Sequence, residues 1–146
     1  MTPLPIGILL ADDNEDDVLL LRLAFRETKL LNILDAVGGG DRALAYLRRQ
    51  GKYAGAKMPG LVMLDVNMPR LDGFATLREI KADSALRHLP VIILTTSQRD
   101  EDICQAYRDG ACTCMAKPVG LDESRDFAGR FEAYWALVAK LPKPAN

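Results

Sequence analysis

Short, mostly apolar runs recur along the chain and alternate with segments that mix hydrophobic and polar residues at helical spacing. Five such runs occur, at residues 6–11, 32–37, 61–65, 91–95 and 111–116. Apolar runs of this length, bounded by glycine, proline or charged residues, are typical of strands that are buried on both faces. The pattern therefore predicts the strands of a parallel sheet.

A helix is expected after each strand. The helical spacing predicts helices at about 15–28, 41–50, 72–82, 99–109 and 122–139. Asn14 or Asp13 is expected to cap the first helix and Asp41 the second, Asp72 to begin the third, and Gly110 to end the fourth. Regular alternation of strand and helix predicts an α/β fold, a doubly wound five-stranded parallel sheet with helices on both faces.

The composition is that of an ordinary globular chain and excludes several classes of function. The 146 residues are 49% hydrophobic and 27% charged, which predicts a single domain over 1–146. A net charge of −1 gives no attraction to nucleic acid or anionic lipid. The sequence has no apolar stretch near the roughly 20 residues that span a bilayer and no signal peptide, so we expect a cytoplasmic protein.

Three cysteines are too few, and odd in number, for a disulfide framework, which agrees with a reducing compartment. Cys112 and Cys114 are expected on one face of the last strand, as small packed residues.

Polar side chains follow four of the five predicted strands at the points where these strands end. Asp12 and Asp13 follow the first strand and Asp65 ends the third. Thr95 ends the fourth strand and Lys117 follows the fifth. The carboxyl ends of parallel strands meet at one edge of the sheet, where ligands of such folds bind. The sequence therefore predicts one site with three acids, a hydroxyl and an amine.

These residue types are suited to phosphoryl transfer with Mg²⁺, which prefers carboxylate and carbonyl oxygens. Asp13 and Asp65 could bind the ion directly, Asp12 through water, and Asn67 through its backbone carbonyl. A carboxylate oxygen of Asp65 could then attack a phosphoryl group. The sequence predicts covalent phosphorylation of an aspartate, with Lys117 and the Thr95 hydroxyl contacting the phosphoryl oxygens.

Several motifs resemble the receiver domains of two-component response regulators. They are Leu9 to Asn14, Leu64 to Pro69, Leu71-Asp72-Gly73, Leu94 to Ser97 and Lys117-Pro118. Thr95 lies 30 residues and Lys117 52 residues after Asp65, which are the offsets that the family shows. The resemblance covers about 6–141 and implies the CheY-like or flavodoxin-like fold, with five helices and strand order 2-1-3-4-5.

The resemblance also implies a role for each site residue. Asp65 would accept a phosphoryl group from a histidine kinase, and Asp12, Asp13, Asp65 and the Asn67 carbonyl would hold Mg²⁺. Thr95 would be the switch hydroxyl and Lys117 the partner of the phosphoryl group, next to a cis Lys117–Pro118 bond. Catalysis would be limited to the protein's own phosphorylation and slow dephosphorylation, so the role is signalling rather than that of a metabolic enzyme.

A narrower resemblance is to the stand-alone regulators that pair with bacterial phytochromes. It rests on segments 41–49, 87–92 and 94–97, and on 134–137 with Leu141-Pro142. It implies a phytochrome histidine kinase as partner. The last helix carries an aromatic stripe that is expected to be mostly core, with Trp135 as a possible contact in a homodimer.

One departure from the family concerns signal transmission, and two other functions stay open. Cys114 occupies the place where many receivers carry an aromatic residue that rotates with the switch hydroxyl.

A Mg²⁺-dependent phosphatase of the aspartyl-phosphate type is one alternative function, although Asn67 stands where such a phosphatase needs an acid. A flavin carrier is another, although the acidic segment 12–17 disfavours phosphate.

Overall fold

The computed structural model describes residues 6–28, 32–96 and 99–137, apart from the side chains of 32 and 134–137. One five-stranded parallel sheet forms the centre, in the order β2-β1-β3-β4-β5. The strands are β1 (Ile6–Ala11), β2 (Asn32–Val37), β3 (Leu61–Asp65), β4 (Val91–Thr95) and β5 (Thr113–Ala116). The predicted fold class and strand order are confirmed.

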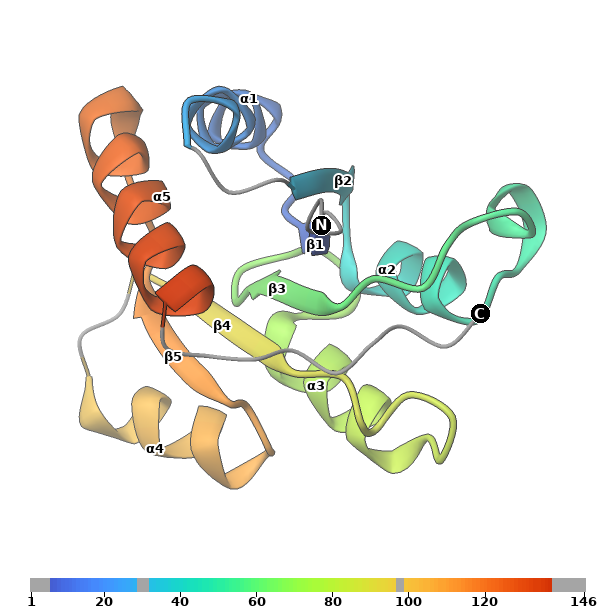
Figure 1. Ribbon diagram of the computed structural model, residues 1–146. Coiled ribbons are helices and arrows are strands. Elements are labelled where there is room, and N and C mark those ends of the chain that lie inside the picture. Colours follow the sequence, from blue (N-terminus) through green and yellow to red (C-terminus); the bar gives the residue numbers. More distant parts are fainter. Residues whose placement is uncertain (1–5, 29–31, 97–98, 138–146) are drawn as a thin grey trace.

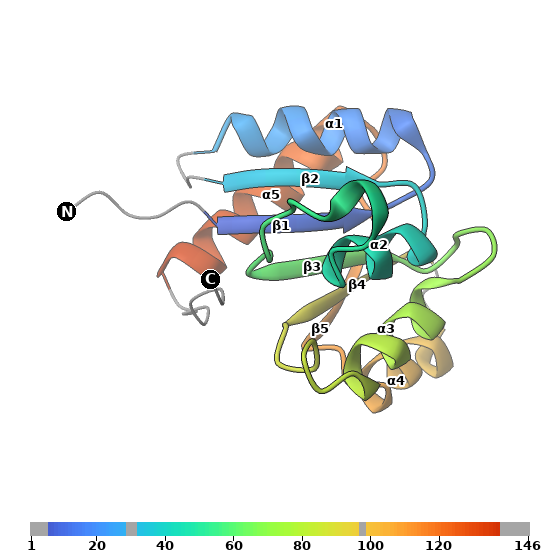
Figure 2. The same ribbon diagram turned by 90° about the vertical axis from the view of Figure 1, so that its right-hand side faces the viewer.

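Four α-helices connect the strands, a fifth follows the last strand, and together they cover both faces of the sheet. They are α1 (Glu15–Arg26), α2 (Gly40–Leu47), α3 (Gly73–Ala82), α4 (Asp100–Arg108) and α5 (Gly120–Leu137), and a short 3-10 helix spans Gly51–Tyr53. Helices α1 and α5 lie on one face, and α2, α3 and α4 lie on the other (Figures 1 and 2). No helix in the described part of the chain combines the length and apolar character needed to cross a membrane.

Two hydrophobic clusters fill the space between the sheet and its helices. Alternate residues of a strand point to opposite faces, so Leu9 and Ala11 join the cluster under α2, α3 and α4. Ile8 and Leu10 join the cluster under α1 and α5. In that second cluster Phe25 makes edge-to-face contacts with Phe127 and Phe131, at 6.4 and 5.2 Å between ring centroids.

The α5 aromatic stripe is therefore core at Phe127 and Phe131, as predicted. The Trp135 side chain lies outside the described residues, so its contact in a homodimer stays a prediction.

Two helix starts differ in how they are capped. The Asn14 side chain accepts a hydrogen bond from the Asp17 amide (3.1 Å), so Asn14 caps α1 as expected. The prediction that Asp41 caps α2 is wrong. The Ala43 amide donates to the Gly39 carbonyl at 3.0 Å, so the helix cap is Gly39, two residues earlier, and Asp41 lies in the first turn of α2.

The start of β5 corrects the prediction for Cys112. The Cys112 amide donates to the Val91 carbonyl (2.9 Å), but the strand begins only at Thr113 and the Cys112 side chain is exposed. Gly110 ends α4 as predicted, with φ of 103°. Because the chain enters the sheet only after this turn, Cys114 packs against the core and Cys112 does not.

Candidate functional site

The parallel register brings the polar strand ends to one edge of the sheet. Asp65 is the last residue of β3 and pairs with Leu94 of β4, so Thr95 lies one step beyond it. Thr95 in turn pairs with Ala116, the residue before Lys117. On the other side of β3, Ala11 pairs with Leu64, which places Asp12 beside Asp65.

Three carboxylates gather at this edge. Asp12, Asp13 and Asp65 each offer an oxygen, and these oxygens lie within 4.8 Å of one another. Asp12 and Asp65 are only 5% and 3% exposed, whereas Asp13 is exposed. Asp12 Oδ1 accepts a hydrogen bond from the Asn14 amide at 2.9 Å, and Asp65 Oδ1 accepts a long one from the Asn67 amide at 3.4 Å.

The Lys117 ammonium lies against this cluster. Its Nζ is 2.9 Å from Asp65 Oδ2, 3.0 Å from Asp17 Oδ2 and 3.1 Å from Asp12 Oδ2. Burial lowers the pKa of Lys117, but the carboxylates of Asp65, Asp17 and Asp12 outweigh burial and raise that pKa above its usual value. Lys117 is therefore a permanent cation at neutral pH.

The charges of the site suit a divalent cation. Four carboxylates and one ammonium leave a net charge of −3 when all are ionised. Burial raises the pKa of Asp12, although the Asn14 amide and Lys117 oppose that rise. A hard cation would relieve this burial cost, and a cluster of carboxylate oxygens is the donor set that Mg²⁺ prefers. The residues present therefore fit Mg²⁺.

Thr95 and Asn67 lie where the sequence places them, at the rim of the cluster. Thr95 is buried at the end of β4, and its carbonyl accepts a hydrogen bond from the Lys117 amide at 2.9 Å. Asn67 is exposed in the loop after β3. The roles of the Thr95 hydroxyl and the Asn67 carbonyl stay predictions.

Asp17 is a site residue that sequence reasoning missed. It lies in the first turn of α1, where an acidic side chain is expected simply because of the helix dipole. Asp13 precedes Asn14, the residue that caps α1, and is not part of the helix, so helical spacing does not relate Asp17 to the predicted acids. Its contact with Lys117 spans 100 residues of sequence and depends on the position of α1.

The expected cis Lys117–Pro118 bond is wrong for this structure, because the described residues contain no cis peptide bond. The trans form has the lower free energy for most X–Pro bonds. With this bond trans, the Lys117 side chain already reaches all three of its carboxylate partners.

Cys114, at the position of the usual rotating aromatic, has an aromatic neighbour from α4. The Tyr107 hydroxyl accepts a hydrogen bond from the Cys114 amide at 3.3 Å and lies 3.4 Å from the Thr113 hydroxyl. Tyr107 as a whole residue is 49% exposed. A phenol thus covers the outer edge of β5, although it comes from a helix rather than from the strand.

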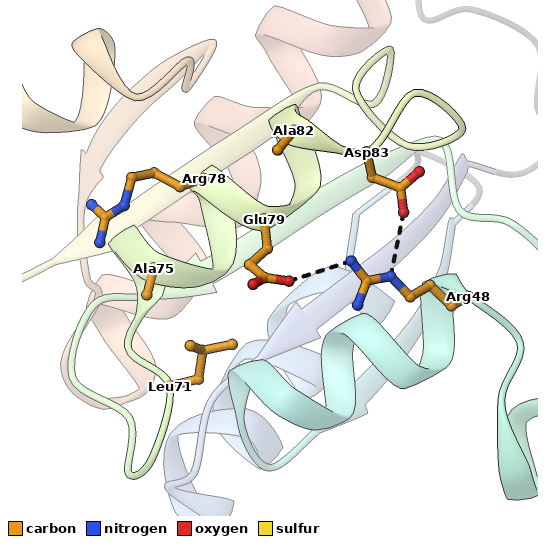
Figure 3. A pocket seen from close by; sticks show the side chains of 7 residues that line it. All are labelled: Arg48, Leu71, Ala75, Arg78, Glu79, Ala82 and Asp83. Carbon is orange, nitrogen blue, oxygen red and sulfur yellow. Dashed lines mark hydrogen bonds and ion pairs between the residues drawn. The ribbon is translucent and has the colours of Figure 1, made fainter.

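A surface groove of about 510 Å³ lies apart from the acidic cluster, between α2 and α3. Arg48, directly after α2, points toward Glu79 of α3 and Asp83 beyond it, at 3.3 Å from each carboxylate (Figure 3). Arg78, also at the groove, pairs with Asp109. None of the site residues predicted from sequence lines this groove, and its charged groups pair with one another or with Asp109, directly after α4.

The comparisons with known proteins agree on one protein family. Residues 8–127 match the response regulator receiver domain family. The probable methanogenesis regulatory protein FilR2 of Methanothrix harundinacea is 32% identical over 141 residues, which cover 97% of this chain and 90% of FilR2. Response regulator Rcp1 of Synechocystis sp. is 30% identical over 138 residues, which cover 94% of each protein.

Solved structures of response regulators are also similar to this chain over almost its whole length. The phosphorylated cyanobacterial phytochrome response regulator RcpA superposes with a TM-score of 0.88 at 34% identity, over 96% of this chain and 100% of RcpA. The Mn²⁺-bound form of Rcp1 superposes with a TM-score of 0.86 at 30% identity, over 95% of this chain and 100% of Rcp1.

Proposed function

This chain belongs to the response regulator receiver family, whose members are two-component response regulators, and on that premise we propose that Asp65 is its phosphoacceptor. The observation that carries the proposal is the 2.9 Å contact between Lys117 Nζ and Asp65 Oδ2, within a cluster of three carboxylates. The family match over residues 8–127 supports a single receiver domain as the unit that carries this role.

In the proposed reaction an oxygen of Asp65 attacks the phosphorus of a phosphohistidine. The new O–P bond forms as the P–N bond breaks, and the electron pair of that bond returns to the imidazole nitrogen. Lys117 remains protonated throughout and stabilises negative charge on a phosphoryl oxygen. The Thr95 hydroxyl, at the end of β4, donates a hydrogen bond to another phosphoryl oxygen.

Asp12, Asp13 and Asp65, with the Asn67 carbonyl, are the proposed Mg²⁺ ligands. Bound Mg²⁺ would offset the negative charge that the phosphoryl group brings to the site. The Mn²⁺-bound form of the similar regulator Rcp1 supports a divalent cation here. The chain's own contribution is to hold the carboxylates together, which it does through the strand register and the Asn14 amide.

The proposed phosphoryl donor is a histidine kinase of the phytochrome type. RcpA, a phytochrome response regulator, is similar over almost the whole chain, and this similarity supports the choice of partner. FilR2 is about equally similar and is named for another process. Transfer from a phosphorylated phytochrome kinase, compared with an unrelated kinase, tests the partner. Because such kinases use ATP, we place the reaction in the cytoplasm.

Two alternatives are disfavoured by the residues of the site. A phosphatase of the aspartyl-phosphate type needs a general acid two residues after the nucleophile, and Asn67 cannot transfer a proton. A flavin site would need a phosphate-binding first loop, whereas Asp12, Asp13 and Asp17 put negative charge there. The family is one of signalling proteins rather than metabolic enzymes.

Phosphorylation with acetyl phosphate tests the central assignment. We expect the wild-type chain to gain the mass of one phosphoryl group when Mg²⁺ is present and to gain none after chelation with EDTA. Asp65→Asn should gain none in either condition, because the amide oxygen is a far weaker nucleophile than the carboxylate.

Asp35→Asn is the matched control for this experiment. Asp35 is an exposed aspartate of β2 that hydrogen-bonds to Tyr46, outside the acidic cluster. It should therefore label like wild type. Labelling of Asp65→Asn at the wild-type level would refute the assignment.

A further inference from the structure

The Lys117 ammonium is surrounded by three carboxylates, and it donates a hydrogen bond to one of them, Asp65. An ammonium group carries three protons, and three carboxylates lie within 3.1 Å of Nζ, those of Asp65, Asp17 and Asp12. A phosphoryl oxygen that pairs with Lys117 therefore competes with these partners for the ammonium.

Two of the three partners are held in place by other contacts. Asp65 carries the phosphoryl group itself, and its side chain is only 4% exposed. The Asp12 side chain is 3% exposed, and its second oxygen accepts a hydrogen bond from the Asn14 amide. Without Mg²⁺, turning the Asp12 carboxylate away from Lys117 would leave a charged oxygen buried without a partner, which is costly. Asp65 gives up its carboxylate charge when it is phosphorylated, but its side chain stays buried at the end of β3 beside Nζ.

Asp17 differs from the other two partners in its surroundings. Its side chain is 28% exposed, and it lies in the first turn of α1 at the surface. A carboxylate in this place can rotate into water, where hydration and the helix N-terminus still stabilise its charge. Asp17 is therefore the partner that Lys117 can lose at the lowest cost.

We propose that Asp17 is a positioning residue, which holds Lys117 over Asp65 before phosphorylation and is displaced from Nζ by the phosphoryl group. This inference rests on the proposed function of Asp65. Asp17 thereby opposes phosphorylation, because its ion pair with Lys117 exists only in the unphosphorylated state. Removing its charge should favour the phosphorylated state.

The test compares Asp17→Asn with Asp16→Asn. Asp16 is the preceding residue of the same helical turn, is exposed, and has no ion pair among those found in the described part of the chain. Both variants lose one negative charge near the site, so their difference isolates the contact with Lys117. Binding of beryllofluoride with Mg²⁺ is measured by calorimetry, and the rate of labelling by acetyl phosphate is measured by mass spectrometry.

Asp17→Asn should bind beryllofluoride about three to five times more tightly than Asp16→Asn, the range expected for a partly exposed ion pair. It should also label faster. Asp17→Glu, which keeps the carboxylate, should return both values toward wild type. Equal behaviour of Asp17→Asn and Asp16→Asn, or weaker binding by Asp17→Asn, would overturn the inference.

A measurement on the wild-type chain follows the displacement directly. The ¹³C resonance of the Asp17 carboxylate should shift when beryllofluoride is added with Mg²⁺, whereas that of Asp16 should not. An unchanged Asp17 resonance would also overturn the inference. Failure of the proposed function is distinguishable, because the wild-type chain would then take up neither beryllofluoride nor a phosphoryl group.

Discussion

Lys117 compensates charges that the fold brings together at considerable cost. Asp12 and Asp65 are buried, and each approaches the same ammonium within 3.1 Å. Two carboxylates that contact the same ammonium lie close enough to repel one another strongly where little water reaches them. Lys117 therefore stabilises the folded state as well as contacting the phosphoryl group.

Replacing Lys117 by methionine should lower the free energy of unfolding by about 3 kcal/mol without Mg²⁺, because it leaves buried carboxylates without their cation. Mg²⁺ should restore more stability to this variant than to wild type, because it binds only the folded cluster. Urea unfolding with EDTA or Mg²⁺ measures both effects. The exposed Lys57→Met serves as control and should change little. Equal loss in the two variants would contradict this account.

At the scale of elements, the start of α3 fixes the backbone beside Asp65. The Asp72 side chain accepts a hydrogen bond from the Ala75 amide at 2.8 Å and caps the helix. The Gly73 amide donates to the Val66 carbonyl at 3.0 Å. A Cβ on Gly73 would lie 2.5 Å from the Asp65 carbonyl oxygen and 2.9 Å from Val66 Cα, so only glycine fits there.

Gly73→Ala should therefore lower the free energy of unfolding by about 1–3 kcal/mol, the usual cost of forcing extra atoms into a packed place. The clash is with backbone atoms, which cannot turn aside as a side chain can. Urea unfolding checks the loss. Gly55→Ala is the matched control, since a Cβ there would meet no atom within 4 Å. Equal stability of the two variants would contradict the close approach of Gly73 to the backbone of Asp65.

At the scale of the whole molecule, two groups couple stability to alkaline pH. Lys117 has its pKa raised by three carboxylates, which outweigh burial. Burial and the Asp35 carboxylate, which accepts the Tyr46 hydroxyl at 2.8 Å, raise the pKa of Tyr46 from 10.0 to about 12. In both cases the folded state binds the proton more tightly than the unfolded state. Each contribution is therefore complete below the unfolded pKa and is lost as the pH rises through the folded pKa.

The free energy of unfolding should thus fall as the pH rises above about 10. Tyr46→Phe should reduce this fall, because the unfolded chain no longer gains stability by ionising that phenol. Asp35→Asn should also reduce it, because the carboxylate that helps to raise the pKa of Tyr46 is gone. Urea unfolding at pH 8 and pH 11 measures the difference. A fall as large in both variants as in wild type would exclude Tyr46 from this coupling.

The sequence by itself determined the architecture and most of the site. Strands β1 to β4 have the predicted bounds, because apolar runs of this length can only be buried in the centre of such a fold. Asp12, Asp13 and Asp65 meet as predicted, because parallel strands present their carboxyl ends at a common edge. Lys117 joins Asp12 and Asp65 for the same reason.

Only the tertiary structure decided the features that depend on how distant elements approach. Asp17 reaches Lys117 because α1 packs on the sheet at one angle, and no spacing in the sequence fixes that angle. The exposure of Cys112 likewise follows from the path of the turn before β5. Local patterns determine which residues must be buried, whereas the direction of a side chain at a helix end or in a turn depends on packing between distant parts of the chain.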